Sequence, residues 1–301
     1  MSYQEYLEIY VQVINEELER RNIPGKARPG EQKKNGVVKK GICVDAMDGS
    51  YSAFYQMGYS DAEELLEDLI REEVEILAKD DVMDFVYDFQ KGKDYVHESF
   101  LHNMEDTEFV KKAIVPYLFS LKHGDHLERN LVYREFLDMA IGYRVNLKRL
   151  YNVDGSFAIS RSYAARIGLT EEDLYKIALN NASECIETIS MKFICQMTGN
   201  PEFGKQPSDM MEIVRLDYQQ YGAGGVLVKE TLEKYAKENK TKRVVIIPSS
   251  IHECILIPEE KVCVGELKSL VREVNATKVE PGEVLSDSLY YYDLKKGYGK
   301  Y

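Results

Sequence analysis

A serine, a histidine and a glutamate stand together at the corner between two apolar segments, 244–247 and 255–257. Ser250, His252 and Glu253 could supply the nucleophile, base and orienting carboxylate of a hydrolase. The β-branched segments predict adjacent strands, however, and neighbours on a strand point to opposite faces. The corner also lacks the glycines that flank a hydrolase serine. We therefore expect a packed, hydrogen-bonded histidine and keep these three residues as the catalytic candidates.

Two further groups of polar residues could bind a metal ion. Asp45, Asp48 and Gly49 could begin an acidic site, because hard cations take several carboxylate oxygens. No third or fourth ligand follows nearby, and aspartate and glycine are common in hairpin turns. His123 and His126 lack a cysteine or glutamate partner at a zinc-binding spacing. We expect a hairpin turn, two solvent-exposed histidines, no metal and no cofactor.

The glycine-rich segment 222–225 precedes an expected helix, as phosphate-binding loops do. Lys229 follows closely and could contact an anion. The segment has neither the lysine of a P-loop nor the complete glycine spacing of a dinucleotide fingerprint. We interpret it as a glycine turn that lets a helix pack on a strand.

Acidic residues are concentrated between positions 61 and 88. Twelve stand there against Arg71 and Lys79, and the whole chain has a formal net charge of −12. Such a segment repels a nucleic-acid backbone and attracts a basic protein partner. The candidate partner-binding residues are Glu64, Glu67, Asp68 and Glu72. The alternative interpretation is a solvated helix face that serves solubility.

Composition limits the class of protein. With 301 residues and 44% apolar content, the chain can bury a substantial core. No apolar run approaches the roughly 18 residues that span a bilayer, and the amino terminus is acidic, so we expect neither membrane insertion nor secretion. Cysteines occur at 43, 185, 195, 254 and 263 without a CxxC pair. We therefore expect the cysteines to be reduced and mostly buried, and the protein to be cytoplasmic.

Periodicity predicts an α+β fold, with mixed or antiparallel sheets and packed amphipathic helices. We expect two regions, 1–110 and 111–301, which could be continuous. Expected helices cover 3–21, 61–79, 184–197, 228–238 and 266–275, with two more that begin after Ser160 and Thr170; expected strands cover 37–44, 50–57, 113–121, 136–147, 157–159, 213–218 and 288–292, besides the pair above. The segment 22–36 should be a loop, and the tail 295–301 should fray.

Several segments resemble an uncharacterised bacterial family known as domain of unknown function 5688. They include Ile-Pro-Ser-Ser-Ile-His-Glu at 247–253, Val-Arg-Glu-Val-Asn-Ala-Thr at 271–277 and the tyrosine-rich stretch 284–293. Segments 167–175 and 221–224 are similar to its middle portion, so the resemblance covers roughly 110–293. It implies a cytoplasmic bacterial protein and supplies no catalytic residue.

Two functions from different classes therefore stay open. The first is a non-enzymatic interaction or regulatory module, which would use the acidic helix or the strand that carries Tyr290, Tyr291 and Tyr292. The second is a hydrolase or metal-dependent enzyme at His252 and Glu253, assisted by Asp45, Asp48 or Asp287. Because the polar residues do not converge in the sequence, we favour the module.

Overall fold

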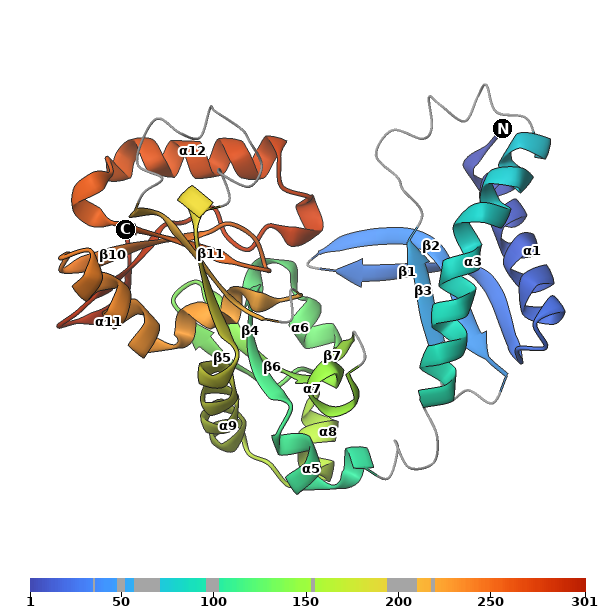
Figure 1. Cartoon of the computed structure of the whole chain (residues 1–301), viewed down its shortest axis with the longest axis horizontal. Coiled ribbons are helices and arrows are strands. Elements are labelled where there is room, and N and C mark those ends of the chain that lie inside the picture. Colours follow the sequence, from blue (N-terminus) through green and yellow to red (C-terminus); the bar gives the residue numbers. More distant parts are fainter. Residues whose placement is uncertain are drawn as a thin grey trace. The chain divides into compact units, whose positions relative to one another are not determined.

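The computed structural model describes residues 1–34, 36–47, 52–56, 71–95, 103–152, 155–193, 210–217 and 220–301 (Figure 1). The chain forms two compact units, Met1–Met104 and Glu105–Tyr301. Both combine helices with antiparallel sheets, so the α+β prediction is confirmed. None of the helices in the described ranges is both long and apolar enough to cross a bilayer.

The first unit packs two helices with a small sheet. Its described elements are α1 (Tyr3–Arg20), β1 (Gly25–Lys34), β2 (Val37–Ala46), β3 (Ser52–Gln56) and α3 (Arg71–Tyr95). The strands are antiparallel in the order β1-β2-β3. A capping box between Ser2 and Glu5 begins α1, and its apolar stripe joins the core with residues of α3 and the sheet. The predicted amino-terminal helix and the β2–β3 hairpin are confirmed.

The expected loop at 22–36 is wrong, because ten of its residues form β1. β1 pairs with β2 along its whole length. It lies at the edge of the sheet, where a proline such as Pro29 is tolerated since one side of the strand needs no partner. Gly30 lies against Cys43, where an added Cβ would come within 2.3 Å of the sulfur. The glycine is therefore needed for close approach inside a strand.

The second unit contains two sheets. Within the described residues its strands are β4 (Ile114–Ser120), β5 (Tyr133–Phe136), β6 (Met139–Asn146), β7 (Ser156–Ala158), β8 (Ile186–Ser190), β9 (Glu212–Leu216), β10 (Arg243–Pro248), β11 (Cys254–Pro258), β12 (Tyr290–Asp293) and β13 (Gly297–Lys300). One sheet has the order β4-β6-β5, with β7 also paired to β6, and the other has the order β13-β12-β10-β11-β9-β8. The predicted pairing of 244–247 with 255–257 is confirmed.

Helices and 3₁₀ turns cover these sheets. They are α5 (Thr107–Lys111), η1 (Leu121–His123), α6 (Asp125–Glu128), α7 (Leu147–Tyr151), α8 (Arg161–Arg166), α9 (Glu171–Glu184), η4 (Gly222–Leu227), α11 (Lys229–Glu238), η5 (Glu259–Lys261), α12 (Val264–Thr277) and η6 (Pro281–Glu283). Ser160 and Thr170 cap α8 and α9 as predicted. The two faces of the six-stranded sheet differ. Val245 and Ile247 of β10 form a cluster with Val271 of α12, whereas Ile246 lines a small cavity together with Leu118 of the other sheet.

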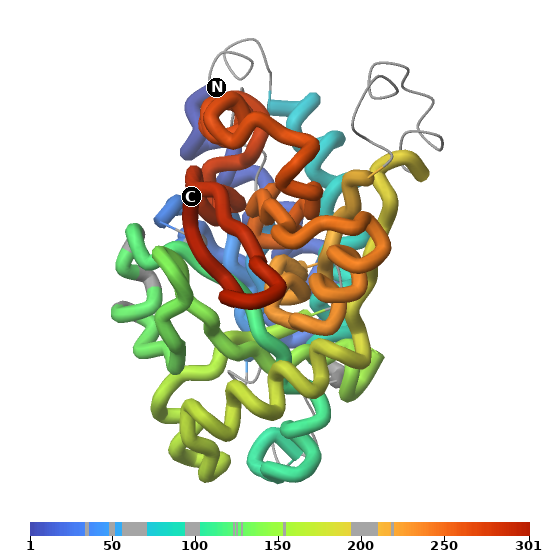
Figure 2. Tube along the Cα trace, turned by 90° about the vertical axis from the view of Figure 1, so that its left-hand side faces the viewer, coloured from blue at the N-terminus to red at the C-terminus, as the bar shows by residue number. Residues whose placement is uncertain are grey.

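Two further expectations about this unit are wrong. Residues 186–190 form β8 rather than a continuing helix, because Ile186 and its neighbours pair with β9. The carboxyl-terminal tail does not fray: β13 pairs with β12 and closes the edge of the sheet (red in Figure 2). Tyr298 secures this hairpin by donating a hydrogen bond from its hydroxyl to the carbonyl of Val226, 2.9 Å away.

A carboxylate in the turn between β5 and β6 holds the carboxyl-terminal hairpin. Asp138 accepts hydrogen bonds from Lys300 at 2.6 Å, Tyr290 at 2.6 Å and Ser288 at 3.1 Å. Partial burial raises the pKa of Asp138, but these hydrogen bonds outweigh burial and hold the pKa below its usual 3.8. The stabilisation is therefore complete above pH 3.8 and disappears as the pH falls through the lowered pKa.

We expect Asp138→Asn to destabilise the protein by about 1–2 kcal/mol at pH 7, since the site is partly exposed. The difference from wild type should shrink toward zero well below pH 3.8. Thermal unfolding followed by circular dichroism at both pH values tests this. A destabilisation of the same size at both would show that the carboxylate charge is not responsible.

Candidate functional site

His252 lies in the loop between β10 and β11, where both of its ring nitrogens are engaged. Its Nδ1 accepts a hydrogen bond from the backbone N–H of Tyr221 at 3.1 Å. Its Nε2 lies 3.2 Å from Oε1 of Glu283, to which it can donate. A general base needs a free nitrogen lone pair, and this arrangement uses the only one that a neutral imidazole has. The ring acts as a bridge between three chain segments.

Neither of the other two candidates forms a hydrogen bond with the imidazole. Ser250 accepts a hydrogen bond on Oγ from the backbone N–H of His252, at 3.0 Å, which makes it a turn residue. The backbone carbonyl of Glu253 accepts from the N–H of Ser250 at 3.3 Å. The carboxylate beside His252 is thus that of Glu283, and the structure does not bring Ser250 and Glu253 to the ring nitrogens.

Tyr221, which donates to His252, has an unusual backbone conformation. Its φ of 58° lies in the left-handed region, where a bulky residue is rare. The guanidinium of the buried Arg144 lies 4.1 Å from the centre of its ring, and Tyr117 contacts the same ring edge-on. Cation–π contact and the hydrogen bond to His252 hold the turn that leads into η4. This cluster joins the two sheets of the second unit.

The remaining polar groups singled out in the sequence are held separately. Asp45 of the first unit accepts hydrogen bonds from Ser52 and Arg28, which hold its pKa below the usual value. Asp287 accepts from Asn275 at 3.0 Å. Asp48 lies outside the described residues. Across the described parts of the chain, no three His, Cys, Asp or Glu side chains gather where they could hold a metal ion.

The expectation of an exposed His126 is wrong. Its side chain is buried, and its ring packs edge-on against Tyr133 and near Phe119. The described thiols are free, as expected, but their burial varies: Cys185 and Cys254 are buried, whereas Cys263 is exposed. Burial raises the pKa of Cys185 to about 11, so this thiol is not a nucleophile at neutral pH.

The tyrosine-bearing strand offers little surface to a partner. Tyr290 and Tyr292 are buried on the face opposite α12. Tyr291 is half-buried and packs against Tyr301 and the guanidinium of Arg243. The three tyrosines therefore close the core and the sheet edge.

Helix α3 carries apolar side chains on two sides. One side is buried in the first unit and comprises Val74, Ala78, Val82, Val86 and Phe89. On the other side Ile76, Met83 and Tyr87 are exposed by 64%, 45% and 48%. Their spacing of seven and four residues places them on one side of the helix, away from Val74 and Val86. Met83 lies at the border with α1, where its sulfur is 3.7 Å from the guanidinium of Arg21. This spacing is present in the sequence, within a segment that is otherwise dominated by acidic residues.

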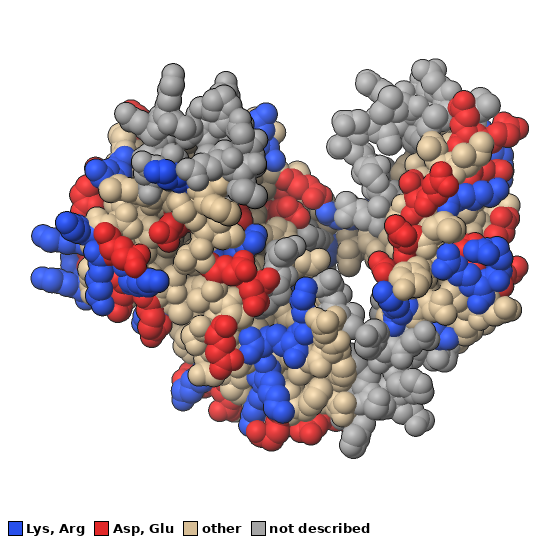
Figure 3. Space-filling model, viewed as in Figure 1, with Lys and Arg blue, Asp and Glu red and all other residues tan. Residues whose placement is uncertain are grey.

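Carboxylates border this exposed line. Glu72, Asp80 and Asp84 are exposed on this side of α3, as are Lys79 and Lys91. Figure 3 shows acidic and basic side chains interspersed with uncharged surface on the body that carries the helix. We call Ile76, Met83 and Tyr87 together with Glu72, Asp80 and Asp84 the outer face of α3. Of the four predicted partner-binding acids, only Glu72 lies within the described residues; Glu64, Glu67 and Asp68 lie outside them. Leu77 is exposed as well.

Comparison with known proteins gives a family and no activity. A model of a family of unknown function, DUF5688, matches residues 3–294. No curated protein and no solved structure matches the chain. The match covers the expected region 110–293 and also the amino-terminal third, which the sequence motifs had left out. The chain therefore belongs to the family of unknown function DUF5688.

Proposed function

We propose that this protein is a cytoplasmic, non-enzymatic interaction module that binds a basic, amphipathic segment of a partner protein on the outer face of α3. The observation that carries the proposal is the line of Ile76, Met83 and Tyr87, exposed on one side of the helix and bordered by acids. Single exposed apolar residues are ordinary, but three on one side of a helix, with Lys79 and Asp80 between Ile76 and Met83, offer anchor points for a partner.

The three apolar side chains suit the centre of an interface. Tyrosine supplies a large contact area at a low entropic cost, and methionine adapts its shape to a partner. Burying such side chains gives about 1.5–3 kcal/mol for each one fully covered. A partner helix with apolar residues four and seven positions apart would match this line.

Charge favours a basic partner. The chain as a whole carries a net charge of −12, and carboxylates line the outer face. The ring of Tyr87 holds the ammonium of Lys91 at 4.4 Å, a position that a partner's cation would have to take over. Lysine and arginine on both sides of the partner's apolar residues would meet Glu72, Asp80 and Asp84.

The geometry of His252 supports a role without catalysis. Both ring nitrogens are used in bridging Tyr221 and Glu283, and Ser250 serves the backbone of the same loop. A hydrolase would instead need the serine hydroxyl within hydrogen-bond reach of a free imidazole nitrogen. The hydrogen bonds of His252 and Ser250 therefore favour the interaction module over the hydrolase.

A designed peptide tests the proposal. We expect an 18-residue helical peptide with leucines in the spacing of the outer face and flanking lysines to bind the complete chain, measured by fluorescence anisotropy. Affinity should fall with added salt, and the same peptide with glutamates in place of lysines should not bind. Asp80→Lys with Asp84→Lys should weaken binding at least about tenfold, since like charges then oppose each other.

The matched control is Glu230→Lys with Glu238→Lys, which reverses two exposed acids on α11 and leaves the total charge of the two variants equal. It should bind the lysine peptide as wild type does. Equal weakening in both double variants would mean that only net charge attracts the peptide, and would contradict a docking site on α3. Both double variants then serve as baits in affinity purification of the natural partner. The partner should copurify with the α11 variant but not with the α3 variant.

A further inference from the structure

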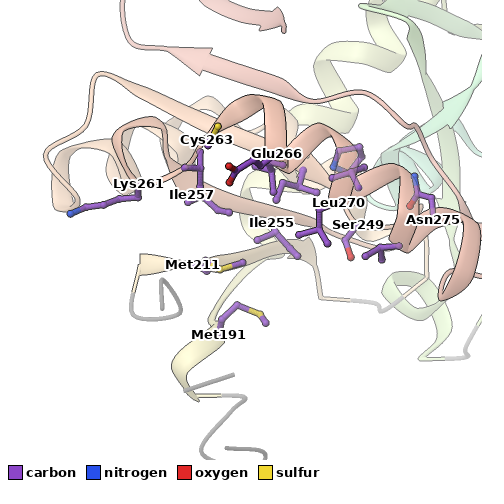
Figure 4. Close-up of a pocket in the computed structure, with 16 residues that line it drawn as sticks. Met191, Met211, Ser249, Ile255, Ile257, Lys261, Cys263, Glu266, Leu270 and Asn275 are labelled. Carbon is purple, nitrogen blue, oxygen red and sulfur yellow. The ribbon is translucent and has the colours of Figure 1, made fainter. Parts of the chain in front are cut away.

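A groove lies in the second unit between α12 and the six-stranded sheet, and no function proposed above uses it. Its volume is about 560 Å³, within the range of roughly 300–1,000 Å³ that small-molecule sites occupy. Ile247, Ile255 and Ile257 line it from the sheet, and Leu267, Leu270 and Val274 line it from the helix (Figure 4). An occupant would therefore meet aliphatic side chains on two opposing walls.

The groove exists because α12 contacts the sheet along only part of its surface. Val271 is buried against Val245, Ile247 and Ile257, whereas Leu270 remains 52% exposed although its helical position predicts an inward side chain. Leu270 and its neighbours are thus held over apolar strand residues without filling the space between. Met191 and Met211, which lie at the opposite side in Figure 4, add adaptable thioether side chains to the lining.

One charged group points toward this space. In Figure 4 the carboxylate of Glu266, an exposed side chain, points toward Ile257 at the edge of the groove, whereas the ammonium of Lys261, which also belongs to the lining, points away from it. Glu266 belongs to the first turn of α12, and none of the described lysines or arginines forms an ion pair with it. At the other end, the amide of Asn275 already donates to Ser286 and Asp287. The groove therefore has an apolar middle and one acidic end.

The walls exclude most polypeptide occupants. An extended peptide would bury backbone N–H and C=O groups against aliphatic side chains, where nothing would pair with them. A helix has a diameter of roughly 10 Å, yet Val271 holds α12 in direct contact with the sheet beside the groove. An alkyl chain carries no polar groups and meets neither obstacle.

We propose that the groove binds a small cationic amphiphile, a molecule with one unbranched or lightly branched apolar chain and one amine. The chain lies along α12 between Leu270 and Ile255, and the ammonium group lies at the carboxylate of Glu266. The carboxylate of Glu266 is the feature that favours a cation over an anion of the same length at this end of the groove. This inference is independent of the outer face of α3.

A series of twelve-carbon compounds tests the assignment. Dodecylamine, dodecanol and dodecanoate, each below its micelle-forming concentration, would compete with a fluorescent apolar probe on the complete chain. We expect the amine to bind at least about tenfold more tightly than the carboxylate, with the alcohol between them. Glu266→Gln should reduce the affinity for the amine to that for the alcohol and leave the alcohol unchanged.

A second pair of variants distinguishes binding in the groove from nonspecific hydrophobic binding to the protein surface. Leu270→Trp fills the space and should weaken all three compounds at least about tenfold, whereas Leu294→Trp, at a 40% exposed leucine between β12 and β13, should change nothing. Binding that survives Leu270→Trp, or a carboxylate that binds as tightly as the amine, would overturn the assignment. A basic peptide that displaces the amine from the wild-type groove would assign it to a protein segment instead.

Discussion

Replacing Gly224 by alanine is expected to destabilise the protein by about 3 kcal/mol, among the largest effects that one methyl group can have. A Cβ at this position would lie 2.5 Å from the carbonyl oxygen of Pro116, 3.0 Å from its carbonyl carbon and 3.3 Å from the Cα of Tyr117. All three contacts are to the backbone of β4, which cannot turn away as a side chain can. Urea unfolding of wild type and variant measures the effect through the midpoint concentration.

Gly265 provides the control, because it lies in the first turn of α12 with nothing within 4 Å of its added Cβ. Gly265→Ala should be neutral or slightly stabilising, since alanine is the better helix former. The comparison also decides what the glycines of 222–225 do. If Gly224→Ala folds with wild-type stability, close packing against β4 is not their purpose, and the phosphate-binding interpretation becomes open again.

Tyr87→Ala is expected to weaken binding of the lysine peptide about 30-fold, the effect of losing a central aromatic residue worth roughly 2 kcal/mol. The same variant should change the free energy of unfolding by less than about 0.5 kcal/mol, because the ring lies on the exposed side of α3. Fluorescence anisotropy and urea unfolding on the same samples separate the two effects. Ile76→Ala should follow the same pattern with a smaller loss.

Leu294→Ala removes an exposed apolar side chain from the second unit and serves as the control for both variants. It should leave the peptide affinity at the wild-type value. An unchanged affinity in Tyr87→Ala and Ile76→Ala would show that these apolar side chains do not contribute to peptide binding. Binding would then depend only on the attraction between opposite charges.

Elements that the sequence predicted have local causes. The stripe from Leu7 to Leu18 and the capping box at Ser2 define α1, and Thr170 with Asp173 begins α9 in the same way. β1 and β13 escaped prediction because their residues are rich in glycine, lysine and proline, and these strands form only through pairing with a neighbour. Pairing depends on the partner strand, which local propensity does not describe.

The candidate sites also differ in how far the sequence alone could identify them. The sequence indicated a structural His252, but its partner Glu283 is 31 residues away and could not be identified from spacing. The apolar line on α3 was readable from Ile76, Met83 and Tyr87 at helical spacing. The groove could not be predicted from the sequence. Leu270 and Val274 occupy helical positions that predict inward side chains, and only the tertiary structure shows that α12 leaves space between these residues and the sheet.

Methyl NMR of the complete chain, labelled at isoleucine and methionine, tests the central claim most directly. Addition of the lysine peptide should shift the signals of Ile76 and Met83, which lie on the outer face of α3. The signals of Ile255 and Ile257, which line the groove of the second unit, should stay in place. Unchanged Ile76 and Met83 signals under saturating peptide, or shifts confined to the second unit, would contradict the docking of a basic partner on α3.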